Sequence, residues 1–376
     1  MTNRERALNI LHYKPVDRIP AVHFGYWKEL LLEWAEKDEI PRSVAEAWGD
    51  GNAADRELDS LIGWDFNWYS CVGGRMGLNP PFQRIVLEEL PDGSQKIRSS
   101  EGIIEMVKPG LSSIPSEVDY LLKDRDSFLE LFEPKMRYSA DRVKRDFFEH
   151  FNENRSYDRP VGLHVGSILG DIRNMTSVTG LAYLMYDEDE ELLSDIVDTY
   201  ANMQYKVVEE ILATGAKFDF AHFWEDVCFK NGPLVSPDKF EELCAHHYKK
   251  RCDLLHSYGI DIISLDCDGV TDKLLPIWFE NGVNVMFPIE IGTWGDQFRP
   301  ARERFGKGML GVGAMDKTAL RKDRAAVDDE LRRIKALVGL GGYIPCPDHR
   351  LMPGTKLDLV KYYVEKIKEM TVKCCE

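Results

Sequence analysis

Long apolar runs are absent from this sequence, and so is a cysteine framework. No segment of the 376 residues approaches the ~20 consecutive apolar residues that a membrane-spanning helix needs. Residues 1–7 are polar and charged, so we expect no signal peptide. The eight cysteines contain no Cys-x-x-Cys pair and follow no regular spacing, which argues against a disulfide scaffold. These absences predict a reduced, cytoplasmic protein.

The sequence also contains fewer basic than acidic residues. Lys and Arg number 48 against 64 Asp and Glu, which gives a net charge of −16. A surface this acidic repels nucleic acid and anionic membranes, so neither is an expected partner. The composition is otherwise that of a soluble globular protein, with 44% hydrophobic and 30% charged residues. A polyanionic substrate would therefore need a local basic pocket.

Short apolar segments alternate with helical patterns along the chain. In the predicted helix 187–214, for example, Leu192, Ile196 and Met203 share one face. Eight segments are predicted as strands, namely 19–24, 63–69, 161–165, 218–223, 260–265, 283–287, 309–312 and 342–344. Strands that alternate with helices form a parallel sheet, and eight such units favour a (β/α)8 barrel. An open doubly wound sheet is the alternative, but no Gly-rich phosphate loop follows the first strand.

Two segments depart from the alternation of strand and helix. Residues 4–11 have helical spacing and predict a helical extension before the first strand. Residues 82–108 contain three short strand patterns around a Pro-Asp-Gly turn, which predict a small antiparallel β insertion. Residues 114–156 are predicted to be mainly charged helix. We therefore expect one barrel domain over residues 1–376, with the insertion at 82–108.

Reactive side chains collect where the predicted strands end, which is where barrels of this type carry their chemistry. In the stretch 341–353, two prolines break the last strand and His349 stands just beyond it. Five potential metal ligands come from the last strand ends, namely Asp266, Asp268, Glu290, Cys346 and His349. Such ligands suit a catalytic Zn²⁺ ion, which takes three protein ligands and keeps one position open. The alternative is a metal-free site in which Asp266 or Asp268 sets the tautomer of His349.

Other candidate residues lie on the earlier strands. His23, His164 and His222 each fall within a predicted strand, where a histidine is either hydrogen-bonded structure or part of a site. Glu225 and Asp226 follow the strand 218–223. Carboxylates at that position either cap the next helix or contact a substrate, and the sequence is equally compatible with both roles.

Three motifs resemble the uroporphyrinogen decarboxylase superfamily. They are Asn-Arg-Glu-Arg-Ala-Leu at 3–8 with Lys-Pro-Val-Asp-Arg-Ile-Pro at 14–20, Gly-Pro-Leu-Val-Ser-Pro-Asp-Lys-Phe at 232–240, and His-Arg-Leu-Met-Pro-Gly-Thr at 349–355. They keep the order of the family over nearly the whole chain. The resemblance implies a (β/α)8 barrel with its active site at the carboxyl ends of the strands. The superfamily also contains corrinoid-dependent methyltransferases, whose barrels bind zinc and exchange methyl groups with a separate cobalamin protein.

Departures from the family patterns favour a methyltransferase that resembles the substrate-activating component of an O-demethylase. The decarboxylase carries an arginine soon after the first strand, whereas the matching stretch 23–27 is His-Phe-Gly-Tyr-Trp. Methyltransferases that accept onto a thiol carry His-x-Cys at the fifth strand end and a Cys before the last helix. Here Asp266 and Asp268 stand at the first two of these positions and His349 at the third. Two carboxylates and an imidazole in place of these ligands imply a harder metal site, suited to polarising an ether or phenolate oxygen.

The resemblance therefore implies transfer of a methyl group between a small methylated substrate, here an aryl methyl ether, and the cobalamin of a partner corrinoid protein. No Asp-x-His-x-x-Gly motif occurs, so we expect the cobalamin to arrive on that partner. His349, Glu225 and Asp226 would handle the proton. The expected substrate-binding residues are His23, Tyr26, Trp27, His164, His222 and Trp224. The alternatives are a metal-free decarboxylase or lyase of the uroporphyrinogen decarboxylase type and a non-catalytic binding barrel, and a homodimer is compatible with the superfamily.

Overall fold

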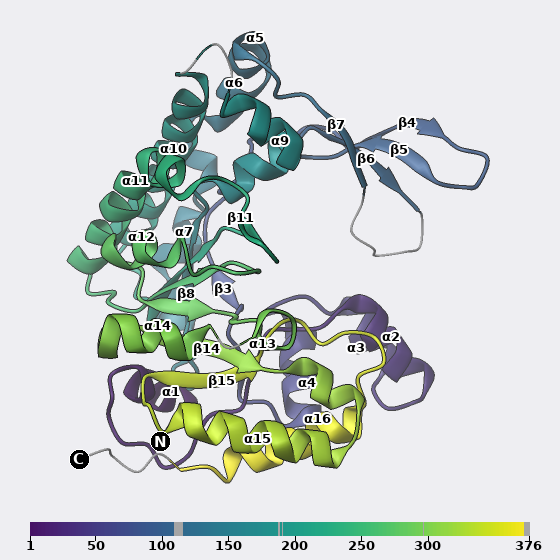
Figure 1. The fold of residues 1–376 in the computed structure, drawn as a ribbon, viewed down its shortest axis with the longest axis vertical. Helices are drawn as coiled ribbons and strands as arrows, with labels where there is room; N and C mark the ends of the chain where they lie inside the picture. The colour runs from purple at the N-terminus through teal and green to yellow at the C-terminus, as the bar shows by residue number, and fades with distance from the viewer. Residues whose placement is uncertain (109–115, 187–188, 190, 296, 372–376) are drawn as a thin grey trace.

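A curled sheet of seven parallel strands forms the centre of the computed structural model, which describes residues 1–371 except 109–115, 187–188, 190 and 296 (Figure 1). The order along the sheet is β15–β14–β13–β12–β9–β8–β3, and each neighbouring pair is parallel. The strands are β3 (Cys71–Val72), β8 (Gly162–Gly166), β9 (Phe220–Trp224), β12 (Ile263–Asp266), β13 (Val285–Phe287), β14 (Leu310–Met315) and β15 (Tyr343–Pro347).

Two short strands complete the wall of the barrel. β1 (Val22–His23) pairs in parallel with β2 (Phe66–Asn67). Beyond β1 the chain runs beside the segment that follows β15, because Leu351 N–H donates to Gly25 O at 3.1 Å and Trp27 N–H donates to Leu351 O at 2.9 Å. At its other end β2 leads, after three intervening residues, into β3, which pairs with β8. The predicted (β/α)8 barrel is therefore confirmed, with β2 and β3 sharing one of its strand positions.

The second predicted strand, 63–69, is interrupted in the structure. Gly63 ends helix α4 (Ala53–Ile62) with a left-handed φ of +98°, so the extended segment starts later than predicted. The Asn67 side chain then accepts the N–H of Tyr69 at 2.9 Å, and Asn67 O accepts the N–H of Ser70 at 3.2 Å. These local bonds turn the chain, and strand pairing resumes only at Cys71.

Helices cover the outside of the sheet, as the alternating pattern predicts (Figure 1). α11 begins where the sequence indicates, because Ser236 Oγ accepts the Lys239 N–H at 3.2 Å and Pro237 occupies the first turn. No helix within the described ranges is both long and apolar enough to cross a membrane. The main helices besides α4 are α1 (Asn3–Leu11), α2 (Lys28–Glu36), α3 (Arg42–Ala47), α9 (Gly170–Leu184), α10 (Leu192–Ala213), α11 (Pro237–Ser257), α12 (Leu275–Glu280), α14 (Phe298–Phe305), α15 (Arg324–Val338) and α16 (Leu357–Lys368).

The antiparallel insertion is larger than predicted and projects from the barrel (Figure 1). It holds four strands in the order β4–β5–β6–β7, whereas the sequence pattern indicated three. The additional strand was missed because its mostly exposed residues fall in the segment that was predicted as charged helix. The four strands are β4 (Ile85–Glu89), β5 (Gln95–Arg98), β6 (Ile103–Val107) and β7 (Ser116–Tyr120).

Shorter elements fill the connections. Between the insertion and β8 the predicted charged helix is broken into short pieces, because β7 occupies the start of that segment. The short elements are α5 (Arg125–Ser127), α6 (Glu133–Met136), α7 (Arg145–Glu149), α8 (Phe151–Asn154), β10 (Cys228–Phe229), β11 (Gly232–Pro233) and α13 (Ile291–Trp294).

We predict that Gly313→Ala in β14 lowers the free energy of unfolding by about 3 kcal/mol or more, because overpacking costs about 1–3 kcal/mol and a left-handed backbone adds to it. Gly313 has φ +132°, and a Cβ there would lie 1.5 Å from Pro288 O, a backbone atom that cannot move aside cheaply. Urea unfolding followed by circular dichroism measures the change. Gly77→Ala is the matched control, since a Cβ at Gly77 meets no heavy atom within 4 Å. Equal losses in both variants would contradict the prediction.

Candidate functional site

Three strand ends meet at the mouth of the barrel. β9 is followed by Asp226, β12 by Asp268 and β15 by His349. His349 Nε2 lies 3.2 Å from Asp268 Oδ2, and the two side chains are 22% and 35% exposed. β13 and β14 separate β12 from β15 in the sheet, so this contact crosses the mouth and depends on the curl of the sheet. Asp226, Asp266, Asp268 and His349 are referred to below as the strand-end cluster.

The carboxylates of the strand-end cluster disfavour one another's charge. Burial raises the pKa of Asp266 well above its ordinary value, and the neighbouring Asp268 and Asp226 raise it further. Burial and Asp268 likewise raise the pKa of Asp226, against which Arg173 acts through an ion pair of 2.9 Å. Asp268 Oδ1 is buried and has no hydrogen-bond partner among the described residues. Arg173 offsets only part of the negative charge of the cluster, and a bound cation or a retained proton would offset more of it.

Asp266, Asp268 and His349 fit a divalent metal ion by their chemistry. Two carboxylates and an imidazole are ligands that Zn²⁺ accepts, and the unpartnered Asp268 oxygen marks a position where a ligand interaction is missing. Among the described residues, two groups of three potential ligands already lie within reach of a single ion, and both are outside the strand-end cluster. They are His23 with Asp55 and Asp59, and Asp198 with His246 and His247.

Of the five predicted metal ligands, Glu290 is engaged by a lysine and Cys346 is buried elsewhere, which corrects the predicted set. Glu290 contacts the Lys317 ammonium at 3.4 Å, and Lys317 in turn contacts Asp348 at 3.3 Å. Cys346 is fully buried within β15, and burial raises the pKa of its thiol well above the ordinary value. Burial raises the pKa of Tyr363 on α16, and Tyr343 and the Cys346 thiol raise it further. The thiol therefore lies near this outer helix.

Glu225 is a structural residue and not the proton carrier that the sequence predicted. It is fully buried, and its carboxylate accepts the backbone N–H groups of Ile168, Leu169 and Gly170 at 2.6, 3.1 and 2.9 Å. The Ser167 hydroxyl adds a bond of 3.2 Å. These donors belong to the start of α9, whose first amides have no partners within the helix. Glu225 therefore has a capping role, but it caps α9 after the neighbouring strand β8 and not the next helix, as the sequence had suggested.

The aromatic stretch after β1 faces away from the barrel mouth, with one exception. His23 is buried against α4, where its Nε2 lies 2.7 Å from Asp59 and its Nδ1 accepts the Gly25 N–H at 2.9 Å. Both ring nitrogens are therefore in use, and no ligand position remains. Phe24 points inward in its place, with its ring 5.5 Å from His349. Successive strand residues face opposite sides, so predicting His23 as the inward residue was wrong by one position.

Tyr26 and Trp27 follow the same outward course. The buried Tyr26 ring packs against His23 at 5.2 Å, against Trp34 of α2 at 5.8 Å and against Trp48 at 5.6 Å. Trp27 is half-buried and occupies the N-cap position of α2. The predicted substrate contacts from His23 and Tyr26 are therefore corrected, since these side chains belong to the packing between β1 and its covering helices.

His222 and His164 lie side by side on neighbouring strands of the barrel. They are direct partners in the pairing of β8 with β9. His222 Nδ1 bonds to Ser264 Oγ at 3.2 Å, while its Nε2 is buried and finds no partner in the described part of the chain. Burial lowers the pKa of His222 to about 3 and that of His164 to about 4, so both rings are neutral at pH 7. A neutral imidazole with a free nitrogen can bind a polar atom of an uncharged ligand.

Aromatic rings surround His222. Tyr69 and Phe287 contact it at 5.3 and 5.5 Å, and Phe24 lies 4.6 Å from Phe287. Two residues before His222 on β9, the ring of Phe220 stacks on that of Trp68 at 4.2 Å. These rings connect the histidine pair to the strand-end cluster through Phe24, and they make this part of the barrel apolar.

Two arginines at the barrel mouth were missed by the sequence analysis. Arg173 on α9 pairs with Asp226 and lies over the Trp224 ring at 5.9 Å. Arg350 pairs with Asp50 at 2.7 Å, and its guanidinium lies 5.3 Å from the rings of both Phe24 and Tyr69. Arg350 could have been found as the neighbour of His349 in its motif, whereas no local pattern distinguishes Arg173.

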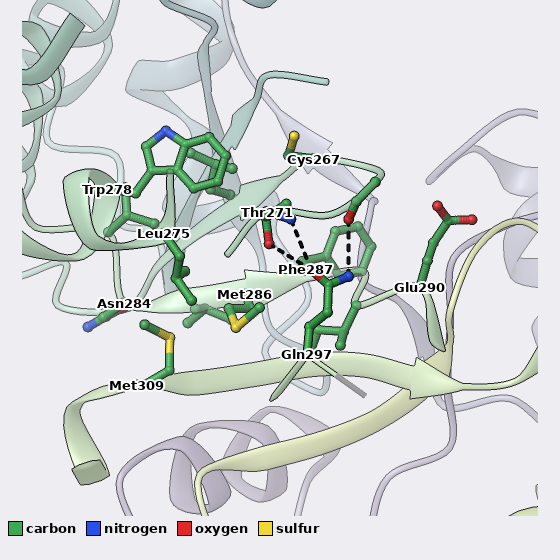
Figure 2. A pocket seen from close by; sticks show the side chains of 15 residues that line it. Cys267, Thr271, Leu275, Trp278, Asn284, Met286, Phe287, Glu290, Gln297 and Met309 are labelled. Atoms are coloured by element: carbon green, nitrogen blue, oxygen red, sulfur yellow. Dashed lines mark hydrogen bonds between the residues drawn. The ribbon is translucent and has the colours of Figure 1, made fainter. Parts of the chain in front are cut away.

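A small cavity lies behind the barrel wall, between β12, β13 and α12 (Figure 2). Its volume of about 20 Å³ suffices for about one water molecule, which excludes a substrate. Cys267 lines it, so the thiol between Asp266 and Asp268 lies on the opposite face of the chain from its neighbours. Figure 2 also shows Glu290 pointing away from the other lining side chains. The cavity is thus separate from the strand-end cluster.

Comparisons with known proteins agree with this fold. The model of a family described as uroporphyrinogen decarboxylase (URO-D) matches residues 171–370. No curated protein matches. A methyltransferase from Methanosarcina mazei aligns over 98% of this chain and 99% of its own, with 17% identity and a TM-score of 0.60. A B12-independent methionine synthase from Shewanella sp. W3-18-1, solved with selenomethionine, aligns over 94% of this chain and 98% of its own, with 12% identity and a TM-score of 0.50. At these identities the two structures indicate a shared fold.

We predict that Glu225→Ala lowers the free energy of unfolding by about 3 kcal/mol or more, because buried amides at the start of α9 lose their acceptor and each costs about 1–3 kcal/mol. Asp226→Asn is the matched control on the adjacent residue, and its partly exposed ion pair predicts a change within about 1 kcal/mol. Urea unfolding of both variants measures the difference. If Glu225→Ala keeps wild-type stability, the capping role is refuted.

Proposed function

The chain belongs to the uroporphyrinogen decarboxylase family, whose model matches more than half of its length, and from that premise we propose that it is a methyltransferase. It moves a methyl group between a small methylated substrate, an aryl methyl ether, and the cobalamin of a separate corrinoid protein. Support for the methyltransferase branch comes from Asp266, Asp268 and His349, which occupy the three positions of the branch's ligand pattern and gather at the barrel mouth.

The strand-end cluster carries this proposal. Mutual repulsion of its carboxylates and the unpartnered Asp268 oxygen favour a bound cation. Asp266, Asp268 and His349 would hold Zn²⁺, which when bound supplies Lewis acidity to an ether oxygen. Asp268 also orients His349 across the mouth, so that loss of either side chain disturbs the other.

The surroundings of the cluster suit an uncharged aromatic substrate. The apolar rings of Phe24 and Phe287 and the neutral His222 offer a surface for a planar ring with one polar contact. Arg173 and Arg350, which reach the mouth, are each paired with an aspartate of the same chain. A substrate with several carboxylates would have to break these pairs, so porphyrinogen decarboxylation is disfavoured.

Removal of a methyl group from an ether requires one proton for the departing oxygen. Asp226 is the residue we assign to this step, because its raised pKa keeps a proton available closer to neutral pH than an ordinary aspartate would. Arg173 holds the Asp226 side chain in place at 2.9 Å. As the C–O bond breaks, the methyl group would pass to the reduced corrinoid of the partner, which supplies the electron pair of the new bond. The departing oxygen takes the Asp226 proton, so the ether becomes a phenol and Asp226 becomes a carboxylate.

The cobalamin belongs to a partner protein in this proposal, because the chain carries no Asp-x-His-x-x-Gly motif. The direct test mixes the purified protein with a reduced corrinoid protein and a panel of aryl methyl ethers, and follows methylation of the corrinoid by its absorbance. Formation of methylcobalamin with release of a phenol is the expected result. If no ether in the panel gives methyl transfer, the proposal fails.

We predict that His349→Ala reduces methyl transfer by about 10²- to 10⁴-fold, the range typical of a lost catalytic side chain. The same variant is expected to lose the zinc bound at the strand-end cluster, which metal analysis of the dialysed protein measures. The control is His150→Ala, which removes an exposed histidine far from His349 in the sequence. This variant should retain both methyl transfer and bound zinc. Wild-type transfer by His349→Ala would contradict the assigned role.

We also predict that His222→Phe raises the KM for the ether by about 3- to 10-fold while kcat changes less, because a single hydrogen bond is worth about 0.5–1.5 kcal/mol. The phenyl ring preserves the aromatic packing against Tyr69 and Phe287 and removes the free nitrogen. His222→Asn keeps a polar group and should recover part of the affinity. Steady-state kinetics distinguish the outcomes, and an unchanged KM in His222→Phe would rule out the contact.

A further inference from the structure

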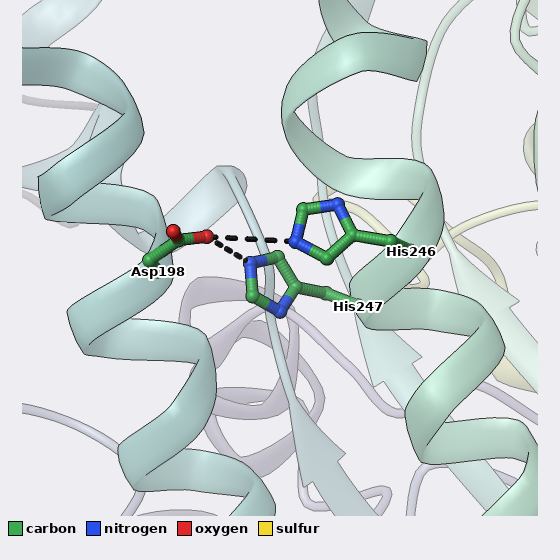
Figure 3. A group of neighbouring side chains, drawn as sticks. All are labelled: Asp198, His246 and His247. Carbon is green, nitrogen blue, oxygen red and sulfur yellow. Dashed lines mark hydrogen bonds and ion pairs between the residues drawn. The ribbon is translucent and has the colours of Figure 1, made fainter. Parts of the chain in front are cut away.

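Three potential metal ligands converge on the outer helical layer, away from the strand ends (Figure 3). Asp198 comes from α10, and His246 and His247 come from α11. Asp198 Oδ1 lies 2.7 Å from His247 Nε2 and 3.5 Å from His246 Nε2. The three ligand atoms all lie within 4.8 Å of one another.

We propose that Asp198, His246 and His247 form a binding site for a divalent transition-metal ion, of which Zn²⁺ and Ni²⁺ are the best matches. Imidazole nitrogens favour these ions over Mg²⁺ and Ca²⁺, which prefer oxygen ligands alone. With metal–ligand bonds of about 2.0–2.1 Å, the ligand atoms of a tetrahedral ion lie about 3.3 Å apart. The distances of 2.7 and 3.5 Å from Asp198 Oδ1 to the two Nε2 atoms lie on either side of that value, so only small side-chain movements are needed.

The arrangement of the two histidines goes beyond an ordinary ion pair. One hydrogen bond from His247 suffices to hold Asp198, yet the 60% exposed His246 also directs its Nε2 to the same oxygen. The two rings are 3.9 Å apart, so two protonated imidazoles there would repel each other. A single shared cation satisfies all three side chains, because both neutral rings and the carboxylate then face one positive charge.

Burial and access around the site suit a bound ion with free coordination positions. His247 is only 4% exposed and is held between the helices, whereas the Asp198 side chain is 49% exposed. Water can therefore complete the coordination from the solvent side. The nearby Lys250 does not compete, since its ammonium donates to Asn202 at 2.9 Å and lies over the Tyr205 ring.

The second ligand group in the described residues provides a contrast. In the group of His23, Asp55 and Asp59, both His23 nitrogens are engaged, and Asp55 accepts the Trp48 indole at 2.7 Å and the Gly51 N–H at 2.8 Å. That group is satisfied by the protein itself. The Asp198 group is open to solvent and has its ligand atoms directed to one point.

A metal ion at this site would join α10 to α11 and stabilise the folded state in proportion to its concentration. Zinc binding to the full-length protein, measured by isothermal titration calorimetry, tests this. We expect wild type to bind one ion at this site, and His246→Ala or Asp198→Asn to weaken that binding at least tenfold. Zinc is also expected to raise the melting temperature of wild type more than that of His246→Ala, which keeps only the strand-end cluster. His247 is left unchanged because its burial makes a folding defect the expected result of its removal.

His256→Ala is the matched control, since it removes an exposed histidine from the same helix and should bind zinc as wild type does. Asp268→Asn separates this site from the strand-end cluster, because it should leave the α10–α11 ion in place. Unchanged zinc affinity and stoichiometry in His246→Ala would overturn the proposal. Loss of all zinc in Asp268→Asn would overturn it as well, whatever the outcome for methyl transfer.

Discussion

The buried carboxylate of Glu225 holds together the part of the barrel on which the candidate site depends. It stands just after β9 and accepts the amides that open α9, the helix that follows the neighbouring strand β8, so the ends of two adjacent strands are joined through one side chain. The approach is so close that a Cβ on Gly170 would lie 1.8 Å from Glu225 O. This junction places Arg173 one turn into α9, next to Asp226. The ion pair at the barrel mouth is thus a consequence of how the helix begins.

The period of two along a strand explains which residues reach the mouth. Asp266 and Asp268 share one face of their chain segment, and Cys267 between them lines a cavity behind the wall. The same rule turns Phe24, which follows β1, inward and His23 outward, although the chemistry of the histidine had favoured it as the inward residue. Residue type alone does not show which side of a short strand faces the barrel interior. A two-residue strand such as β1 is also too short to show an alternation of apolar and polar side chains.

The sequence predicted more of the fold than of the site, for physical reasons. The eight strand positions were found because buried parallel strands are continuous apolar runs, whereas β7 was missed because it lies at an exposed edge. At the site, Asp268 and His349 were predicted from their place at strand ends, and the structure brings them to 3.2 Å. Glu290 and Cys346 also stand near strand ends, but their surroundings, Lys317 and the packing against α16, come from distant parts of the chain.

Charge balance connects the local chemistry with the whole molecule. The chain has a net charge of −16, and the carboxylates of Asp226, Asp266 and Asp268 concentrate negative charge at the barrel mouth. Arg173 and Arg350 offset part of it, but each is already engaged by an aspartate. Such a mouth attracts cations and repels anions, so a neutral ether and a divalent metal ion are better matched to it than a polycarboxylate. The same surplus of acid favours cation binding at Asp198, where two imidazoles already supply nitrogen ligands.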